Sequence, residues 1–170
     1  MSNANKNKGK SFEREFAKHL TSVFNLPFNR IPNSGAFLGG QNAYRESQVS
    51  IEQSLSCYGD IIVPIELKNF SFENKFYQKL AWQKLFDKDG EAKLNKWIEQ
   101  AKQGSRKYWF VVFKINNMGC YVVFDKNISY NIGTNYLIYK NEYCIVSMDK
   151  FFENNKDFML SIDKEVSNGK

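Results

Sequence analysis

The segment Tyr108–Ile115 (YWFVVFKI) constrains the fold more than any other part of this sequence. A nearly continuous apolar run of this length is typical of a strand that is buried on both faces. The following Asn116–Gly119 predicts a hairpin turn into a second strand over 120–124. The predicted elements along the chain follow the order helix, strands, helix, strands. The sequence therefore predicts an α/β fold with one central mixed β-sheet flanked by helices.

The remaining pattern predicts the elements around that sheet. Residues 11–24 have the apolar spacing of an amphipathic helix, and residues 74–103 are expected to be mostly helical with a break near 87–90. Further strands are expected at 59–63, 65–70, 136–139 and 143–146, and a terminal helix at 149–160. We expect one domain over 11–160, with a flexible basic tail at 1–10 and a disordered tail at 161–170.

Composition limits the class of protein. The chain has 170 residues, 42% of them hydrophobic, which suffices for one globular core. Its net charge of +6 favours a polyanionic partner. No segment has the length and apolarity of a membrane span, the polar start is unlike a secretory signal, and the three separated cysteines form no zinc pattern. We expect an intracellular, cytoplasmic protein without a nucleotide cofactor, since no glycine-rich phosphate loop is present.

Two neighbouring stretches carry the candidate chemistry: Gly59-Asp60-Ile61 and Glu66-Leu67-Lys68. On a strand, Glu66 and Lys68 would project from the same face. Carboxylate oxygens suit a hard ion such as Mg²⁺, and a lysine beside them can orient water or meet charge on a phosphate. The ordinary alternatives are a surface ion pair for Glu66 and Lys68, and a turn residue for Asp60.

Glu13 falls within the apolar stripe of the first predicted helix, where an unpaired acid is costly. Two interpretations remain open at this point. It forms a salt bridge to an Arg or Lys at the edge of the core, or it is a third carboxylate directed at the metal.

With these residues in order, the chain resembles the PD-(D/E)XK nuclease superfamily, and most of all phage-type and archaeal-type Holliday-junction resolvases. The resemblance is carried by four stretches: 8–15 with Glu13, 30–36 (RIPNSGA), 59–68 with Asp60, Glu66 and Lys68, and 97–101 (WIEQA) with Gln100. It implies a restriction-endonuclease-like core and Mg²⁺-dependent hydrolysis of DNA, with Mn²⁺ as a substitute. It also implies a homodimer, because a resolvase cuts two symmetric strands, and a phage or bacterial protein acting in the host cell.

The resemblance also implies a role for each residue. The implied metal ligands are Asp60, Glu66, the Leu67 carbonyl and Glu13. Lys68 would position the nucleophile, Gln100 would hold Lys68 or the water, and Ser34 would donate to the phosphate or to water. The implied DNA contacts are Lys6, Lys8, Lys10, Arg30, Ser34 and Arg45. Gln100 on a solvated helix face and Ser34 in a plain turn are the structural alternatives.

The spacing between the two acids is a difficulty. Only five residues separate Asp60 from Glu66. On one straight strand their carboxylates would lie about 20 Å apart, too far to share a cation. The assignment therefore requires a sharp bend at Val63-Pro64, failing which Glu52 or Glu46 would replace Asp60. A nuclease acting on other DNA, in repair, packaging or restriction, and a non-catalytic basic DNA-binding module remain the alternative functions.

Overall fold

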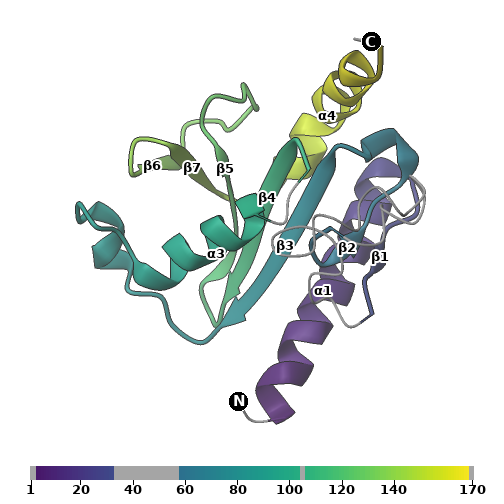
Figure 1. Cartoon of the computed structure of the whole chain (residues 1–170). Coiled ribbons are helices and arrows are strands. Elements are labelled where there is room, and N and C mark those ends of the chain that lie inside the picture. The colour runs from purple at the N-terminus through teal and green to yellow at the C-terminus, as the bar shows by residue number, and fades with distance from the viewer. Residues whose placement is uncertain (1–2, 33–57, 104–105, 169–170) are drawn as a thin grey trace.

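A five-stranded mixed sheet forms the centre of the protein (Figure 1). The computed structural model describes residues 3–32, 58–103 and 106–168. The strand order is β3-β4-β5-β7-β6, and the strands are β3 (Phe70–Tyr77), β4 (Tyr108–Ile115), β5 (Gly119–Asp125), β6 (Tyr136–Tyr139) and β7 (Tyr143–Ser147). β3 and β4 are parallel and the other pairs are antiparallel. The predicted α/β class with a restriction-endonuclease-like core is confirmed.

One face of the sheet is covered by the crossover that joins the two parallel strands. Parallel neighbours need such a connection, and here it contains the 3-10 helix η3 (Trp82–Phe86) and the helix α3 (Ala92–Gln103). The side chains that α3 buries recur at helical spacing: Leu94, Trp97, Ile98 and Ala101. They pack in one cluster with the odd-numbered residues of β4, including Val111 and Phe113.

The opposite face carries α1 (Asn3–Phe24) and α4 (Phe151–Asn168). The Phe16 ring lies 5.6 Å from the Phe72 ring and 5.5 Å from the Phe152 ring, so both helices and β3 meet in one aromatic core. Both helices are longer than predicted. α1 includes residues 3–10, which we expected to be a flexible tail, and α4 continues through 161–168, which we expected to be disordered.

A short ribbon lies along the free edge of β3. It consists of β1 (Asn29–Arg30) and β2 (Ile61–Ile62), which pair antiparallel. The Asp60 amide, directly before β2, donates a 2.8 Å hydrogen bond to the Phe72 carbonyl. The ribbon is thereby attached to the strand that precedes the crossover.

The predicted strand over 65–70 is wrong, and so is the predicted helix over 74–77. The chain does bend at Pro64, but it enters a 3-10 turn, η2 (Ile65–Leu67), and pairs as a strand only from Phe70. Apolar Phe70, Phe72 and Phe76 alternate with polar side chains, which is strand periodicity. A regular helix begins only at Ala92, after Gly90 with its φ of +71°.

Other sequence predictions are confirmed. The strands expected at 108–115, 120–124, 136–139 and 143–146 are β4, β5, β6 and β7, and the short strand within 59–63 is β2. Within the described residues, no helix combines the length and the apolarity needed to cross a membrane.

Candidate active site

Glu73 and Lys75 lie two residues apart on β3 and form a second Glu-X-Lys sequence, Glu73-Asn74-Lys75. Because they are two apart on a strand, both side chains project toward the face that α3 covers. Lys75 Nζ lies 2.5 Å from Glu73 Oε1. Gln100, on α3, accepts a 3.1 Å hydrogen bond from Lys75 Nζ at its Oε1 and donates a 2.7 Å bond from its Nε2 to Glu73 Oε1. The three side chains form a closed triangle.

Asp60 reaches this group from the free edge of β3. Its Oδ2 accepts a 2.8 Å hydrogen bond from the Asn74 amide, and its own amide donates to Phe72, so two backbone contacts fix its position. Asp60 and Glu73 are both buried, at 7% and 8% exposed. Asp60 lies at the edge of this strand segment and Glu73 on its α3 face, and the charge of Asp60 acts on Glu73.

Gly59 permits this close approach. Its φ is +69°, a conformation that L side chains rarely adopt. A Cβ at this position would lie 2.4 Å from the Phe72 carbonyl oxygen, the atom that accepts the Asp60 amide. The Gly59-Asp60 pair in the sequence therefore has a steric cause.

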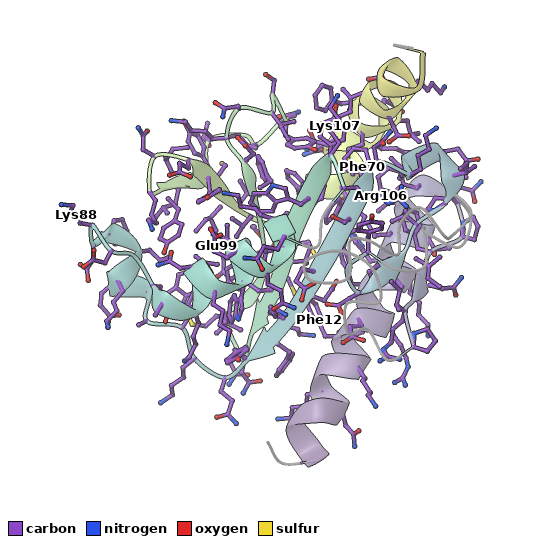
Figure 2. All side chains as sticks on the ribbon, viewed as in Figure 1. Phe12, Phe70, Lys88, Glu99, Arg106 and Lys107 are labelled. Atoms are coloured by element: carbon purple, nitrogen blue, oxygen red, sulfur yellow. The ribbon has the colours of Figure 1, made fainter. Side chains whose placement is uncertain are left out.

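Glu13 contributes a third carboxylate from α1. It forms an ion pair with Arg30 of β1, and the two side chains are 13% and 17% exposed. Its negative charge also raises the pKa of Glu73. The two interpretations of Glu13 are thus compatible, because the acid is paired with a core-edge arginine and lies within electrostatic reach of the site. Figure 2 labels Phe12 on α1 and Glu99 on α3, the helices that supply Glu13 and Gln100.

Burial and, after it, the charge of Asp60 raise the pKa of Glu73 to about 7. Lys75 opposes both effects through its charge and its hydrogen bond. Like charges held together in a desolvated position favour proton uptake, or a cation that compensates them. A carboxyl that titrates near neutral pH is a common property of functional sites.

The donor set fits a hard divalent cation. Asp60 and Glu73 offer carboxylate oxygens, and the carbonyl of Asn74 points to the same strand edge as the amide that binds Asp60. Across residues 3–32, 58–103 and 106–168, no three acidic, His or Cys side chains already stand together as a complete ligand set. A cation here would rest on two carboxylates, with main-chain oxygen and water completing its shell, as Mg²⁺ commonly does.

Glu66, Leu67 and Lys68 do not join this group. Glu66 is exposed in η2, and Leu67 is fully buried in the hydrophobic core. Burial raises the pKa of Asp163 on α4, and the charge of Lys68 opposes that rise, which places Lys68 near that helix. The bend at Pro64 occurs, yet it carries Glu66 to the surface, because η2 packs against α4.

The other predicted residues are distributed as follows. Glu13, Asp60 and Gln100 are brought to the site, Arg30 is paired with Glu13, and Lys8 and Lys10 are exposed on α1. Ser34, Arg45, Glu46, Glu52 and the side chain of Lys6 lie outside the described residues.

Glu73 and Lys75 were missed by the sequence analysis, although two signals identify them. The stretch 70–77 alternates in the manner of a strand, and twelve residues separate Asp60 from Glu73. That separation provides the longer connection that the pair Asp60 and Glu66 lacked.

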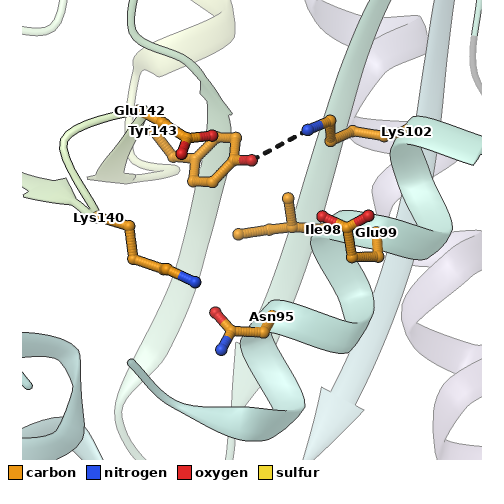
Figure 3. Close-up of a pocket in the computed structure, with 7 residues that line it drawn as sticks. All are labelled: Asn95, Ile98, Glu99, Lys102, Lys140, Glu142 and Tyr143. Carbon is orange, nitrogen blue, oxygen red and sulfur yellow. Dashed lines mark hydrogen bonds between the residues drawn. The ribbon is translucent and has the colours of Figure 1, made fainter. Parts of the chain in front are cut away.

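A cavity of about 230 Å³ lies elsewhere, between α3 and the β6–β7 turn (Figure 3). It is lined by Asn95, Ile98, Glu99, Lys102, Lys140, Glu142 and Tyr143. Lys102 Nζ donates a 3.1 Å hydrogen bond to the Tyr143 hydroxyl, and Asn95 Oδ1 accepts one of 2.6 Å from Tyr139. Its α3 residues lie on a different helical face from Gln100, so the cavity is separate from the Glu73 site.

Comparison with known protein families identifies a family for this chain. A family model described as "Phage putative PDDEXK endonuclease" matches residues 4–165. No curated protein and no solved structure matches the chain. The matched range includes every residue of the candidate site.

Proposed function

Because the chain belongs to the phage PDDEXK endonuclease family, we propose that Asp60, Glu73 and Lys75 form the active site of a metal-dependent DNA endonuclease. The family makes the chain a nuclease. The observation that supports this particular site is the hydrogen-bonded triangle of Glu73, Lys75 and Gln100 beside a buried Asp60. The assignment transfers the roles first given to Glu66 and Lys68 to Glu73 and Lys75.

Asp60 and Glu73 would hold Mg²⁺ or Mn²⁺, together with the Asn74 carbonyl. When bound, such a cation supplies Lewis acidity and a lowered water pKa. Lys75 would orient the attacking water or meet negative charge on the scissile phosphate. Gln100 would keep Lys75 directed at the reacting atoms, since its amide binds both Lys75 and Glu73.

Glu13 would act at the margin of the site. Its ion pair with Arg30 holds the carboxylate in place and balances its charge. The charge of Glu13 still adds to the rise in the pKa of Glu73, so the acid of α1 acts electrostatically on the site. The two carboxylates of Asp60 and Glu73, with Glu13 in electrostatic reach, favour a divalent cation over a monovalent one.

Cations beside aromatic rings mark the proposed DNA path at the end of β3. Lys8 Nζ lies 6.0 Å from the ring of Phe76, and Lys93 Nζ lies 5.5 Å from the ring of Tyr77. Phe76 and Tyr77 directly follow Lys75, and they are approached from α1 on one face and from α3 on the other. We propose that these lysines, with Lys10, contact phosphates, and that Lys6, Arg30, Ser34 and Arg45 extend the contact.

The proposed substrate is branched DNA, with a Holliday junction cut by a homodimer. It is supported by the resemblance in 8–15, 30–36 and 97–101, and by the net charge of +6. Nucleases of repair, packaging or restriction type on linear duplex are the alternative for the same site. A dimer is expected because symmetric incision needs two active sites.

One experiment tests the site and the substrate together. Purified wild-type protein is offered four-way junctions and matched linear duplexes with Mg²⁺ or Mn²⁺, beside the variants Glu73→Gln, Asp60→Asn and Glu66→Gln. We expect the first two to lose cleavage by at least about 100-fold while binding DNA, and Glu66→Gln to cut as wild type. Loss of cleavage in Glu66→Gln alone would refute the proposed site. Equal cutting of junctions and linear duplexes would refute the junction preference. If no DNA is cut with either metal, a non-catalytic DNA-binding module is favoured.

A further inference from the structure

Asn74 interrupts the aromatic face of β3. Residues 70, 72, 74 and 76 share one face of the strand, and the other three are phenylalanines. Asn74 is only 7% exposed. A carboxamide at a buried position among aromatic rings is a departure from the pattern that the packing favours, and such departures concentrate at functional sites.

The side chain of Asn74 is unsatisfied. Within the described part of the chain, neither its Oδ1 nor its Nδ2 has a hydrogen-bond partner, and both atoms are inaccessible. A carboxamide can donate two hydrogen bonds and accept two. Leaving all of them unmade on burial carries the full desolvation penalty, so an unsatisfied buried amide requires an explanation such as water or an ion.

The position of Asn74 indicates what that partner is. Its backbone amide binds Asp60, and its sequence neighbours are Glu73 and Lys75. Phe16 of α1 packs on Phe72, and Lys8 of α1 lies over Phe76. The part of α1 between those two residues therefore faces Asn74, and Glu13 belongs to that part.

We propose that the Asn74 carboxamide is a positioning group for the hydrated cation held by Asp60 and Glu73. Its side chain leaves β3 on the face opposite Glu73 and Lys75, so its oxygen and its NH₂ would bind water of the cation's shell on the α1 side of the free edge, where Asp60 is attached. This deepens the proposed function and rests on it. The role suits an ion such as Mg²⁺, which keeps several waters and is bound partly through them, and outer groups of this kind tune metal affinity.

A purely structural role for Asn74 predicts a different effect of its replacement on cation binding. If the amide were only a packing defect, its replacement by an apolar side chain of similar size would remove the penalty and leave cation binding unchanged. If it binds the hydrated ion, the same replacement weakens cation binding while the metal-free fold is maintained. Metal affinity therefore separates the two readings.

The test is Mn²⁺ binding by the full chain without DNA, followed by electron paramagnetic resonance, with urea unfolding of the metal-free protein in parallel. The variants are Asn74→Leu and Asn74→Ala, so that a folding defect in one leaves the other to be measured. Asn155→Ala is the matched control. Asn155 is 1% exposed, but its side chain bonds to the backbone of Asn131 and of Phe151.

We expect both Asn74 variants to bind Mn²⁺ about 10- to 100-fold more weakly than wild type, with an unfolding midpoint no lower than wild type for Asn74→Leu. Asn155→Ala should show the reverse, a lower midpoint with unchanged Mn²⁺ affinity. Affinities of the Asn74 variants within about twofold of wild type would overturn the inference. Asp60→Asn tells failure of the metal site from failure of the proposed role of Asn74. If Asp60→Asn also binds Mn²⁺ as wild type does, the proposed metal site is wrong. If Asp60→Asn binds weakly while the Asn74 variants bind normally, the metal site stands and only the role of Asn74 is refuted.

Discussion

The backbone amide of Asn74 donates a 2.8 Å hydrogen bond to Oδ2 of Asp60. Through this bond an acid from the loop before β2 is attached to the strand that carries Glu73 and Lys75. Backbone groups at the free edge of β3, which would otherwise pair with a neighbouring strand, instead hold Asp60 close to Glu73.

Lys75 and Lys68 provide a direct comparison of the two Glu-X-Lys sequences. We expect Lys75→Ala to lower the rate of DNA cleavage by about 100- to 1,000-fold, because the Lys75 ammonium group would stabilise the negative charge that develops on the phosphate. Lys68→Ala should leave the rate within about twofold of wild type, since Lys68 lies beside Asp163. Single-turnover cleavage at saturating Mg²⁺ measures both. A severe defect in Lys68→Ala with normal Lys75→Ala would restore the first assignment.

Gln100 is expected to act through Lys75 and Glu73, to which its amide is bonded. Gln100→Ala should lower the cleavage rate about 10- to 100-fold with little change in DNA affinity, because the lysine loses its orientation. Gln100→Glu should be worse, since a third charge near Glu73 raises the pKa of that carboxyl further. The neighbouring Glu99, exposed on the other side of α3, serves as control, and Glu99→Ala should cut DNA normally.

The raised pKa of Glu73 predicts how stability depends on pH without divalent metal. The pKa moves from 4.5 to about 7, so the folded protein holds this proton more tightly than the unfolded chain. The free energy of unfolding should then fall as pH rises from about 4.5 to about 7, by roughly 3 kcal/mol for this group.

Urea unfolding across that pH range, with a chelator present, measures this dependence. Glu73→Gln should flatten it and should be more stable than wild type above about pH 7, whereas Glu66→Gln should keep the wild-type dependence. A wild-type profile that rises across this range, or one unaltered by Glu73→Gln, would show that Glu73 does not titrate there.

Gly59 and Gly133 form a matched pair for the close approach to β3. Both have positive φ, +69° and +63°, but a Cβ at Gly133 would meet nothing within 4 Å. Backbone strain is therefore shared, and the clash with Phe72 is specific to Gly59. Gly59→Ala should destabilise the protein by about 1–3 kcal/mol more than Gly133→Ala does, and it alone should abolish cleavage. Equal effects in thermal unfolding and cleavage would contradict the proposed steric role.

The sheet was predictable where burial on both faces leaves a strong signal. Tyr108–Ile115 is apolar almost throughout, and the turns at 116–119 and 140–142 carry residues that accept positive φ, such as Asn117 and Asn141. The class of fold and the strands β4 to β7 follow from these features. Glu13 was also identifiable, because an acid within an apolar stripe needs a partner, and Arg30 is that partner.

The part of the site on β3 was not predicted, for a physical reason. The strand carries Glu73, Asn74 and Lys75 in succession, so its centre reads as polar and helix-compatible. Glu73 and Asn74 are buried, and Lys75 is half-buried, because α1, α3 and the ribbon β1–β2 cover both faces and the edge. Glu66 and Lys68, by contrast, have the same local sequence without that cover, and local sequence does not distinguish the two cases.

The proposed centre draws Glu13 from one layer of the sandwich, Gln100 from the other, and Asp60 from the edge between them. During synthesis, a nascent chain whose crossover helix is still inside the ribosomal tunnel has Asp60 and Glu73 outside but lacks Gln100. Packing of α3 on the sheet would then also be the step that brings Gln100 to Lys75, so a partly folded copy is expected to cleave DNA more slowly than the finished protein.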